Sequence, residues 1–366
     1  MPPQTLWHAC WRAAKASARY INVGEKALSD SVQTTDEGAT DWGRCLRAFF
    51  ATVVGGASML SMFLILVDPY DSGKFGFLGI EGVADRNSTT ASASRARDAS
   101  FNSAIIGNST ALLIDPNRLS LVTGLRFVQL SVVGRSPREE FTVLDFFLRH
   151  HRHVGALVIV TDPGWCVHDQ RAPGPFPYWI YGESSFTYAV HLMSSDAVEH
   201  AFRRLSIGLG WSKRSDPTGA FPADDVWPAG LFYSKNKPMD PPPATDVADK
   251  DVFPHVMQLN DVVTKLPMDV PVVILVPPTF ATTVPQPDSF AATEKKACDA
   301  ALRKIVAGRP RSNFINYRVD NSLTRDRSNW LDFIHYRPVI AERIGDGIVE
   351  SLHLGEAAKI DFERDR

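Results

Sequence analysis

The chain has 366 residues, of which 44% are hydrophobic and 22% are charged, and its formal net charge is −2. This length and hydrophobic share exclude a disordered polypeptide and fit one large domain or two small ones. The near balance of 39 basic and 41 acidic residues argues against a nucleic-acid partner. The four cysteines form no CxxC pair, which argues against a zinc ribbon, and whether Cys166 pairs with Cys298 stays open.

An apolar run is the first clear element of the chain. Residues 48–67 carry no charge over about twenty positions, the length that a helix needs to cross the hydrocarbon core of a bilayer. The run lies too far from the N-terminus for a signal peptide and lacks a small-residue cleavage pattern. We therefore predict a transmembrane helix over residues 46–67, preceded by a tail over residues 1–45.

The charges on either side of this run predict its orientation. Arg44 and Arg47 precede the run, whereas Asp68 and Asp71 follow it. Because basic residues are retained on the cytoplasmic side, we expect a cytoplasmic tail and an extracytoplasmic domain. The chain would then be a single-pass membrane protein, with a periplasmic domain if its source is a Gram-negative bacterium.

A segment rich in Gly, Ser, Thr and Ala follows the run and shows little periodicity. This composition predicts a stalk over residues 68–98. The folded domain is then expected over residues 99–355, with a C-terminal tail over residues 356–366.

Short apolar runs that alternate with helical patterns predict an α/β domain with a parallel sheet. The expected strands cover residues 104–106, 127–130, 154–161, 270–276 and 314–317. An aromatic, Pro-rich insertion over about residues 166–250 interrupts this order, and we expect it to lie across the carboxyl edge of the sheet. Its aromatic side chains either offer a platform for sugar rings or form a small core of their own.

Three histidines close together, His150, His151 and His153, raise the question of a metal site. They fall where a predicted helix ends, and cations are favoured at the C-terminus of a helix because of its dipole. We therefore expect no metal and no cofactor.

Three other residues suggest nucleophilic catalysis. Ser109 follows the first strand and a turn at Gly107, which places it at the carboxyl edge of the sheet, where α/β folds bind ligands. Asp332 and His335 are three positions apart, so both side chains can project toward one side. A serine that accepts an acyl group needs a base and a carboxylate that orients this base, and these residues supply both.

The stretch Gly107-Asn108-Ser109 after the first strand, together with Asp332 and His335 before the last helix, resembles the motifs of the SGNH/GDSL hydrolase superfamily. The chain is most similar to the membrane-anchored bacterial branch that includes alginate-acetylation and D-alanyl-teichoic-acid proteins. The resemblance covers residues 99–354 and implies a three-layer α/β/α, flavodoxin-like fold.

The resemblance also implies a role for each matching residue. Ser109 would be the nucleophile, His335 the base and Asp332 the carboxylate that orients it. The oxyanion hole would consist of the backbone N–H groups of Ser109 and Gly134, where loss of one such donor typically costs about 3 kcal/mol of transition-state stabilisation.

The chain departs from the family where an Asn is expected after the third strand, because Asp162 stands there instead. An ionised carboxylate would repel a developing oxyanion. We therefore expect Asp162 to bind a substrate hydroxyl, with Trp165 beside it as a stacking surface. The alternative is an Asp-Pro-Gly turn with a packed Trp.

Three functions follow from these expectations. The first is an extracytoplasmic esterase or deacetylase that acts on an acylated envelope or secreted glycan. The second is an O-acyltransferase with the same three residues, working with a membrane-bound acylation partner; a lid of Trp179, Trp211 and Trp227 that excludes water would favour it. The third is a non-catalytic glycan-binding or scaffold protein.

Overall fold

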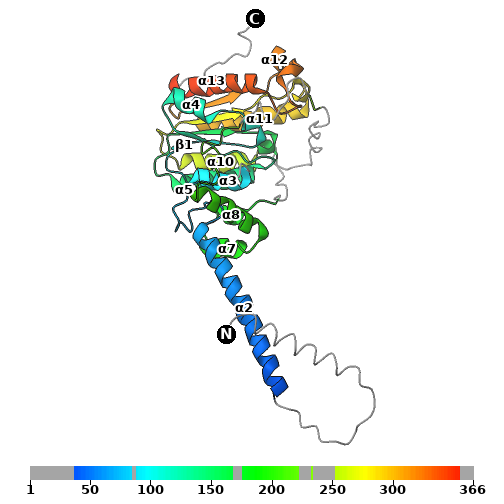
Figure 1. The fold of residues 1–366 in the computed structure, drawn as a ribbon. Helices are drawn as coiled ribbons and strands as arrows, with labels where there is room; N and C mark the ends of the chain where they lie inside the picture. The colour runs from blue at the N-terminus through cyan, green and yellow to red at the C-terminus, as the bar shows by residue number, and fades with distance from the viewer. Residues whose placement is uncertain (1–36, 85–87, 168–174, 222–231, 234–251, 355–366) are drawn as a thin grey trace, which may run out of the picture. The chain divides into compact units, whose positions relative to one another are not determined.

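The computed structural model describes residues 37–84, 88–167, 175–221, 232–233 and 252–354 (Figure 1). Its contacts divide the chain into two units, Met1–Ile65 and Leu66–Arg366. The first unit contains most of one long helix, and the second contains the sheet and the remaining described elements.

The long helix is α2, Glu37–Val67. Its part Trp42–Val67 has 26 residues and a mean hydropathy of 2.1, so it is long and apolar enough to cross a membrane. The expected apolar helix near the N-terminus is thus confirmed. It starts earlier than predicted, because polar residues before the apolar run continue the same helix.

A five-stranded sheet forms the centre of the second unit, with the strand order β2-β1-β3-β4-β5 and every pair parallel. The strands are short and buried along nearly their whole length, as their apolar, β-branched sequences predict. Their bounds are β1 Ser103–Ile106, β2 Phe127–Gln129, β3 Ala156–Val160, β4 Val272–Val276 and β5 Asn313–Asn316.

Helices cover both faces of the sheet, so the predicted three-layer α/β architecture with a parallel sheet is confirmed (Figure 1). On one face, Ile105 and Val158 share a buried cluster with Ile344 and Ile348 of the last helix. This face is covered by α4 (Pro116–Thr123) and α13 (Pro338–Leu354), and the other by α3 (Ser88–Ala96), α5 (Pro137–His150), α10 (Pro254–Thr264) and α11 (Phe290–Val306).

The prediction of a stalk over residues 68–98 is wrong. The second unit begins at Leu66, and α3 packs against α5 with its alanines fully buried. Small side chains let two helices approach closely, so the Ser- and Ala-rich composition reflects packing and not extension. Asp68 and Asp71 are also buried and hydrogen-bonded, so they are not the free flanking charges on which the predicted orientation partly rested.

The described part of the insertion contains three helices, α6 (Tyr178–Tyr181), α7 (Ser185–His191) and α8 (Ser195–Gly208). Its aromatic side chains pack on one another and on the segment that follows α2. The ring of Trp179 lies 5.2 Å from that of Tyr70 and stacks on His191 at 5.0 Å. Of the two alternatives, the described residues show the small core. Trp227 and most of residues 222–251 lie outside the described part.

The histidines at the end of α5 bond to their own helix. The Nδ1 atoms of His150 and His151 lie 2.7 and 2.9 Å from the carbonyl oxygens of Phe146 and Phe147. Within the part of the chain that the structure describes, no three His, Cys, Asp or Glu side chains gather as a metal site would require.

Candidate active site

Ser109 lies at the carboxyl end of β1, in the first position of the short helix η1, Ser109–Ala111. The turn before it depends on Gly107. A Cβ atom at this position would lie 2.9 Å from Cβ of Ala111 and 3.1 Å from the carbonyl oxygen of Val160. Only glycine lets β1 turn this close to β3, and the turn leaves the side chain of Ser109 partly exposed.

Ser109, His335 and Asp332 form a continuous hydrogen-bonded chain. Nε2 of His335 lies 2.8 Å from Oγ of Ser109, and Nδ1 of His335 lies 2.8 Å from Oδ2 of Asp332. The carboxylate of Asp332 is 1% exposed, whereas the imidazole is 21% exposed. A buried acceptor at Nδ1 favours the tautomer with its proton there, which leaves Nε2 free to take the serine proton.

The loop that carries His335 is fixed by backbone and side-chain contacts. Oδ1 of Asp332 accepts hydrogen bonds from the N–H groups of Ile334 at 2.9 Å and His335 at 2.8 Å. Leu331 donates its N–H to the carbonyl oxygen of His335 at 2.8 Å. The buried hydroxyl of Tyr336 donates to the carbonyl oxygen of Thr110, next to the serine. These bonds hold the imidazole in register with Ser109.

Sequence reasoning missed the role of Tyr336. Tyr336 directly follows His335, and this position could have marked it for attention. A tyrosine there does not indicate which group it bonds to, and its partner Thr110 lies 226 positions away. The contact exists only once the loop and η1 are brought together.

Asn108 connects the nucleophile to Asp162. Its Oδ1 accepts from the N–H of Thr110 at 3.0 Å, and its Nδ2 donates to Oδ2 of Asp162. The other carboxylate oxygen, Oδ1 of Asp162, accepts from the N–H of Gly164 at 2.7 Å. Burial raises the pKa of Asp162, and these hydrogen bonds oppose that rise. Both oxygens therefore have partners within the protein.

The surroundings of Trp165 differ from the stacking surface that was expected beside Asp162. Asp162 caps the short helix η2, Pro163–Cys166, and the indole of Trp165 is 1% exposed with its ring 5.1 Å from that of Phe141. The prediction that Trp165 offers a stacking surface is wrong, because the Asp-Pro-Gly turn directs this side chain into the core. The structure matches the alternative, a turn with a packed Trp.

Gly134 lies in a turn after β2, the strand next to β1, at the same edge of the sheet as Ser109. Its φ of 68° is a left-handed conformation that glycine adopts readily. The N–H of Val132 donates to the carbonyl oxygen of Gly107 at 2.8 Å, which holds this turn against the one that carries Ser109.

A buried carboxyl group lies behind this site and was also missed from the sequence. Glu140 of α5 is fully buried, and the indole N–H of Trp165 lies beside its carboxyl without forming a well-aligned hydrogen bond. Burial raises the pKa of Glu140 well above its ordinary value, and the nearby carboxyl of Asp162 adds to this shift, whereas the indole of Trp165 opposes it. The helical pattern did not predict the burial of Glu140, since acidic residues in the first turn of a helix normally face solvent.

A disulfide joins Cys166, the last residue of η2, to Cys298 of α11. The pairing left open by the sequence is therefore present. It ties the turn that carries Asp162 to a helix on one face of the sheet.

Comparisons of this chain with models of protein families, with curated proteins and with solved structures give no match.

Proposed function

We propose that this protein is a membrane-anchored serine hydrolase that cleaves ester bonds outside the cytoplasm. The single observation that carries the proposal is the hydrogen-bonded chain from Ser109 through His335 to Asp332. Its order of nucleophile, base and buried carboxylate is the one that acyl transfer to serine requires.

In the proposed reaction, Oγ of Ser109 attacks the carbonyl carbon of the ester while its proton passes to Nε2 of His335. The negative charge on the carbonyl oxygen would be stabilised by the backbone N–H groups of Ser109 and Gly134. Collapse of this intermediate breaks the ester bond, and the leaving alcohol takes the proton from His335. Water then hydrolyses the acyl-enzyme by the same steps, with Asp332 stabilising the imidazolium each time.

The substrate class that we propose is an O-acylated envelope or secreted glycan. Support comes from the resemblance to the SGNH/GDSL hydrolases, whose motif order agrees with a flavodoxin-like strand order, and from the apolar helix α2 as a membrane anchor.

Two of the three tryptophans expected to form a lid, Trp179 and Trp211, lie in the described part of the chain. Trp179 packs on Tyr70 and His191, and Trp211 is 78% exposed. Neither of these two described side chains encloses a water-free site, which a transferase would need to protect its acyl-enzyme.

A fluorophosphonate probe, which reacts with activated serines, tests the proposal on the full chain in detergent. We expect labelling of the wild type and none of Ser109→Ala. Ser131→Ala is the matched control, because Ser131 also follows a neighbouring strand but bonds only to Gln129 among the described residues, at 2.8 Å. Equal labelling of Ser109→Ala and the wild type would disprove the assignment of Ser109. The wild type and Ser131→Ala should also release acetate from a chromogenic acetate ester, and Ser109→Ala should not.

A further inference from the structure

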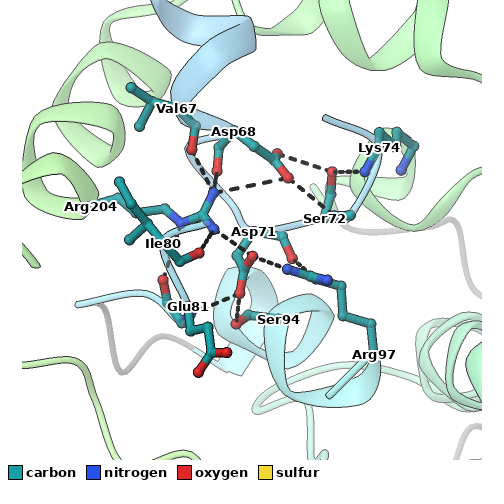
Figure 2. A network of polar contacts seen from close by, with 12 residues as sticks. Val67, Asp68, Asp71, Ser72, Lys74, Ile80, Glu81, Ser94, Arg97 and Arg204 are labelled. Atoms are coloured by element: carbon teal, nitrogen blue, oxygen red, sulfur yellow. Dashed lines mark hydrogen bonds and ion pairs between the residues drawn. The ribbon is translucent and has the colours of Figure 1, made fainter. Parts of the chain in front are cut away.

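The described part of the insertion is fixed to the rest of the second unit through helix α8 and again next to the candidate active site. At α8, Nη2 of the buried Arg204 lies 2.5 Å from Oδ1 of Asp71 and donates to the carbonyl oxygen of Ile80 (Figure 2). Next to the candidate active site, residues 232–233 contact the loop that carries His335. These second contacts link the insertion to the base of the proposed reaction.

Backbone hydrogen bonds join two different segments to this loop, residues 331–335, which we name the His335 loop. The N–H of Tyr233 in the insertion donates to the carbonyl oxygen of Leu331 at 2.7 Å. The N–H of Phe280, in the segment that follows β4, donates to the carbonyl oxygen of Phe333 at 2.9 Å. The His335 loop is therefore bonded both to the insertion and to a segment that continues from the sheet.

Three phenylalanine rings pack on one another at the same place. The ring of Phe232 lies 5.2 Å from that of Phe333 and 5.4 Å from that of Phe280, and the latter two rings are 5.9 Å apart. Aromatic pairs attract each other at such separations. The guanidinium of Arg327 lies 4.5 Å over the ring of Phe232 and adds a cation–π contact. We name Phe232, Phe280 and Phe333 the loop clamp, because they join the insertion and the segment after β4 to the His335 loop.

The proposed reaction depends on where the His335 loop lies as well as on its shape. The bonds from Oδ1 of Asp332 to the N–H groups of Ile334 and His335 lie within the loop, so they fix its shape. Proton transfer also requires that Nε2 of His335 stays within hydrogen-bond reach of Oγ of Ser109, which lies 2.8 Å away. A misplacement of about 1 Å can lower a rate about 100-fold. Contacts that join the loop to the rest of the fold therefore bear directly on turnover.

We propose that Phe232 is a positioning residue, which holds the His335 loop where the imidazole reaches Ser109. This inference rests on the proposed function and gives the insertion a part in it. Phe280 also packs on the fully buried Trp330, with the rings 6.3 Å apart, so its loss would disturb the core as well as the loop. Phe232 is half-buried, so its removal loosens the loop at a smaller cost to the core.

Kinetics of the full chain in detergent test this role. Phe232→Ala removes the ring, and we expect kcat for a chromogenic acetate ester to fall about 10- to 100-fold. KM should stay unchanged, because the role concerns the placement of the base and not the binding of the ester. Phe232→Leu fills part of the space and should have an intermediate kcat. Phe232→Tyr keeps the ring and should have the kcat of the wild type.

Phe75→Ala is the matched control. Phe75 is also half-buried and also packs on an aromatic ring, that of Tyr188 at 5.9 Å, but this pair belongs to the contacts of α7 and not to the loop clamp. We expect Phe75→Ala to lower the melting temperature and to leave kcat unchanged. A loss of kcat in Phe232→Ala alone then separates positioning of the base from a general loss of stability.

The outcomes separate this inference from the proposed enzyme. Equal kcat for Phe232→Ala and the wild type, or a raised KM with unchanged kcat, would overturn the role of Phe232. If Phe232→Ala does not melt cooperatively, equal kcat for Phe232→Leu and Phe232→Tyr would overturn it in the same way. Fluorophosphonate labelling of the wild type tests the enzyme separately. A labelled wild type with any of these results disproves the role of Phe232 alone, whereas a wild type that is not labelled at Ser109 disproves the proposed function and this role with it.

Discussion

Nε2 of His335 lies 2.8 Å from Oγ of Ser109, although 226 positions separate the two residues in the sequence. The sheet explains this proximity. Ser109 follows β1, and His335 comes from the segment between β5 and α13, just before α13, while all five strands run parallel. Residues that follow parallel strands gather at one edge of the sheet, so the order of the elements brings a serine and an imidazole together.

Replacement of Asp332 by asparagine should reduce turnover and leave the fold intact. The amide oxygen can still accept the N–H groups of Ile334 and His335, which now bond to Oδ1. The amide NH₂ would face Nδ1 of His335 and favour the tautomer whose proton points at Ser109. We expect kcat for a chromogenic acetate ester to fall about 10²- to 10⁴-fold, with an unchanged melting temperature.

Asp326→Asn provides the matched control for this change. Asp326 also accepts a backbone N–H group in the same region, from Ser328 at 2.9 Å, but it is not bonded to the imidazole. Its kcat should equal that of the wild type. A kcat for Asp332→Asn that matches this control would show that the carboxylate does not orient His335.

Asp162→Asn should lower activity, although it restores the residue type that the SGNH/GDSL resemblance leads one to expect. Oδ2 of Asp162 accepts the Nδ2 group of Asn108, whose own Oδ1 is held by Thr110. An amide at position 162 that keeps its bond to Gly164 would place two NH₂ groups against each other. One buried donor then loses its partner, which costs about 1 to 3 kcal/mol.

Thermal unfolding and kcat measure this effect on the same sample. We expect a lower melting temperature together with a lower kcat, because the turn that carries Ser109 loses its support. Asp162→Asn with raised kcat would instead show that position 162 faces the oxyanion, as the family pattern implies.

Glu140→Gln should stabilise the fold at neutral pH. The pKa of Glu140 is raised in the folded state, so folding retains a proton that the unfolded chain releases above about pH 4.5. The stability of the wild type is therefore lost as the pH rises from 4.5 toward the folded pKa, by up to about 1.4 kcal/mol for each pH unit. Glutamine avoids this cost, so its melting temperature should exceed that of the wild type at pH 7 and match it below pH 4.5.

The neighbouring Glu139→Gln is an informative control because its sign is opposite. Burial alone would raise the pKa of Glu139, but hydrogen bonds from Ser136 and Tyr178 lower it below its ordinary value. This carboxylate stabilises the fold when the pH is above the pKa of Glu139 in the unfolded chain, and the stabilisation is lost as the pH falls through the lowered pKa of the folded state. We expect Glu139→Gln to lower the melting temperature at pH 7. If both variants shift it in the same direction, the raised pKa of Glu140 does not explain the effect.

The regular part of the fold could be predicted from the sequence because it depends on local pattern. The run over residues 154–161 contains the observed strand Ala156–Val160, and the order of such runs predicts a parallel sheet. The sequence also predicts that Ser109, His335 and Asp332 gather at one edge of the sheet, since each follows a strand or precedes the last helix, and the structure brings the three side chains together.

Contacts across the fold could not be predicted in the same way. The pairing of Asn108 with Asp162 spans 54 positions, and an Asp before Pro-Gly is typical of any turn. The segment after α2 has the composition of a linker, and its burial depends on Arg204, more than 120 positions later. Side chains that gain their partners only in the tertiary structure leave no periodic signal in the chain.

Removal of the disulfide should destabilise the second unit and loosen the turn behind Ser109. The bond joins Cys166 and Cys298 across 132 positions, and the loss of a cross-link over a long loop typically costs about 2 to 5 kcal/mol. We expect the double variant Cys166→Ser/Cys298→Ser to melt at a lower temperature than the wild type. Addition of a reductant should lower the melting temperature of the wild type more than that of the double variant, in which the disulfide of Cys45 remains reducible. Equal melting temperatures for the oxidised wild type and the double variant would show that the turn holding Asp162 does not need this link.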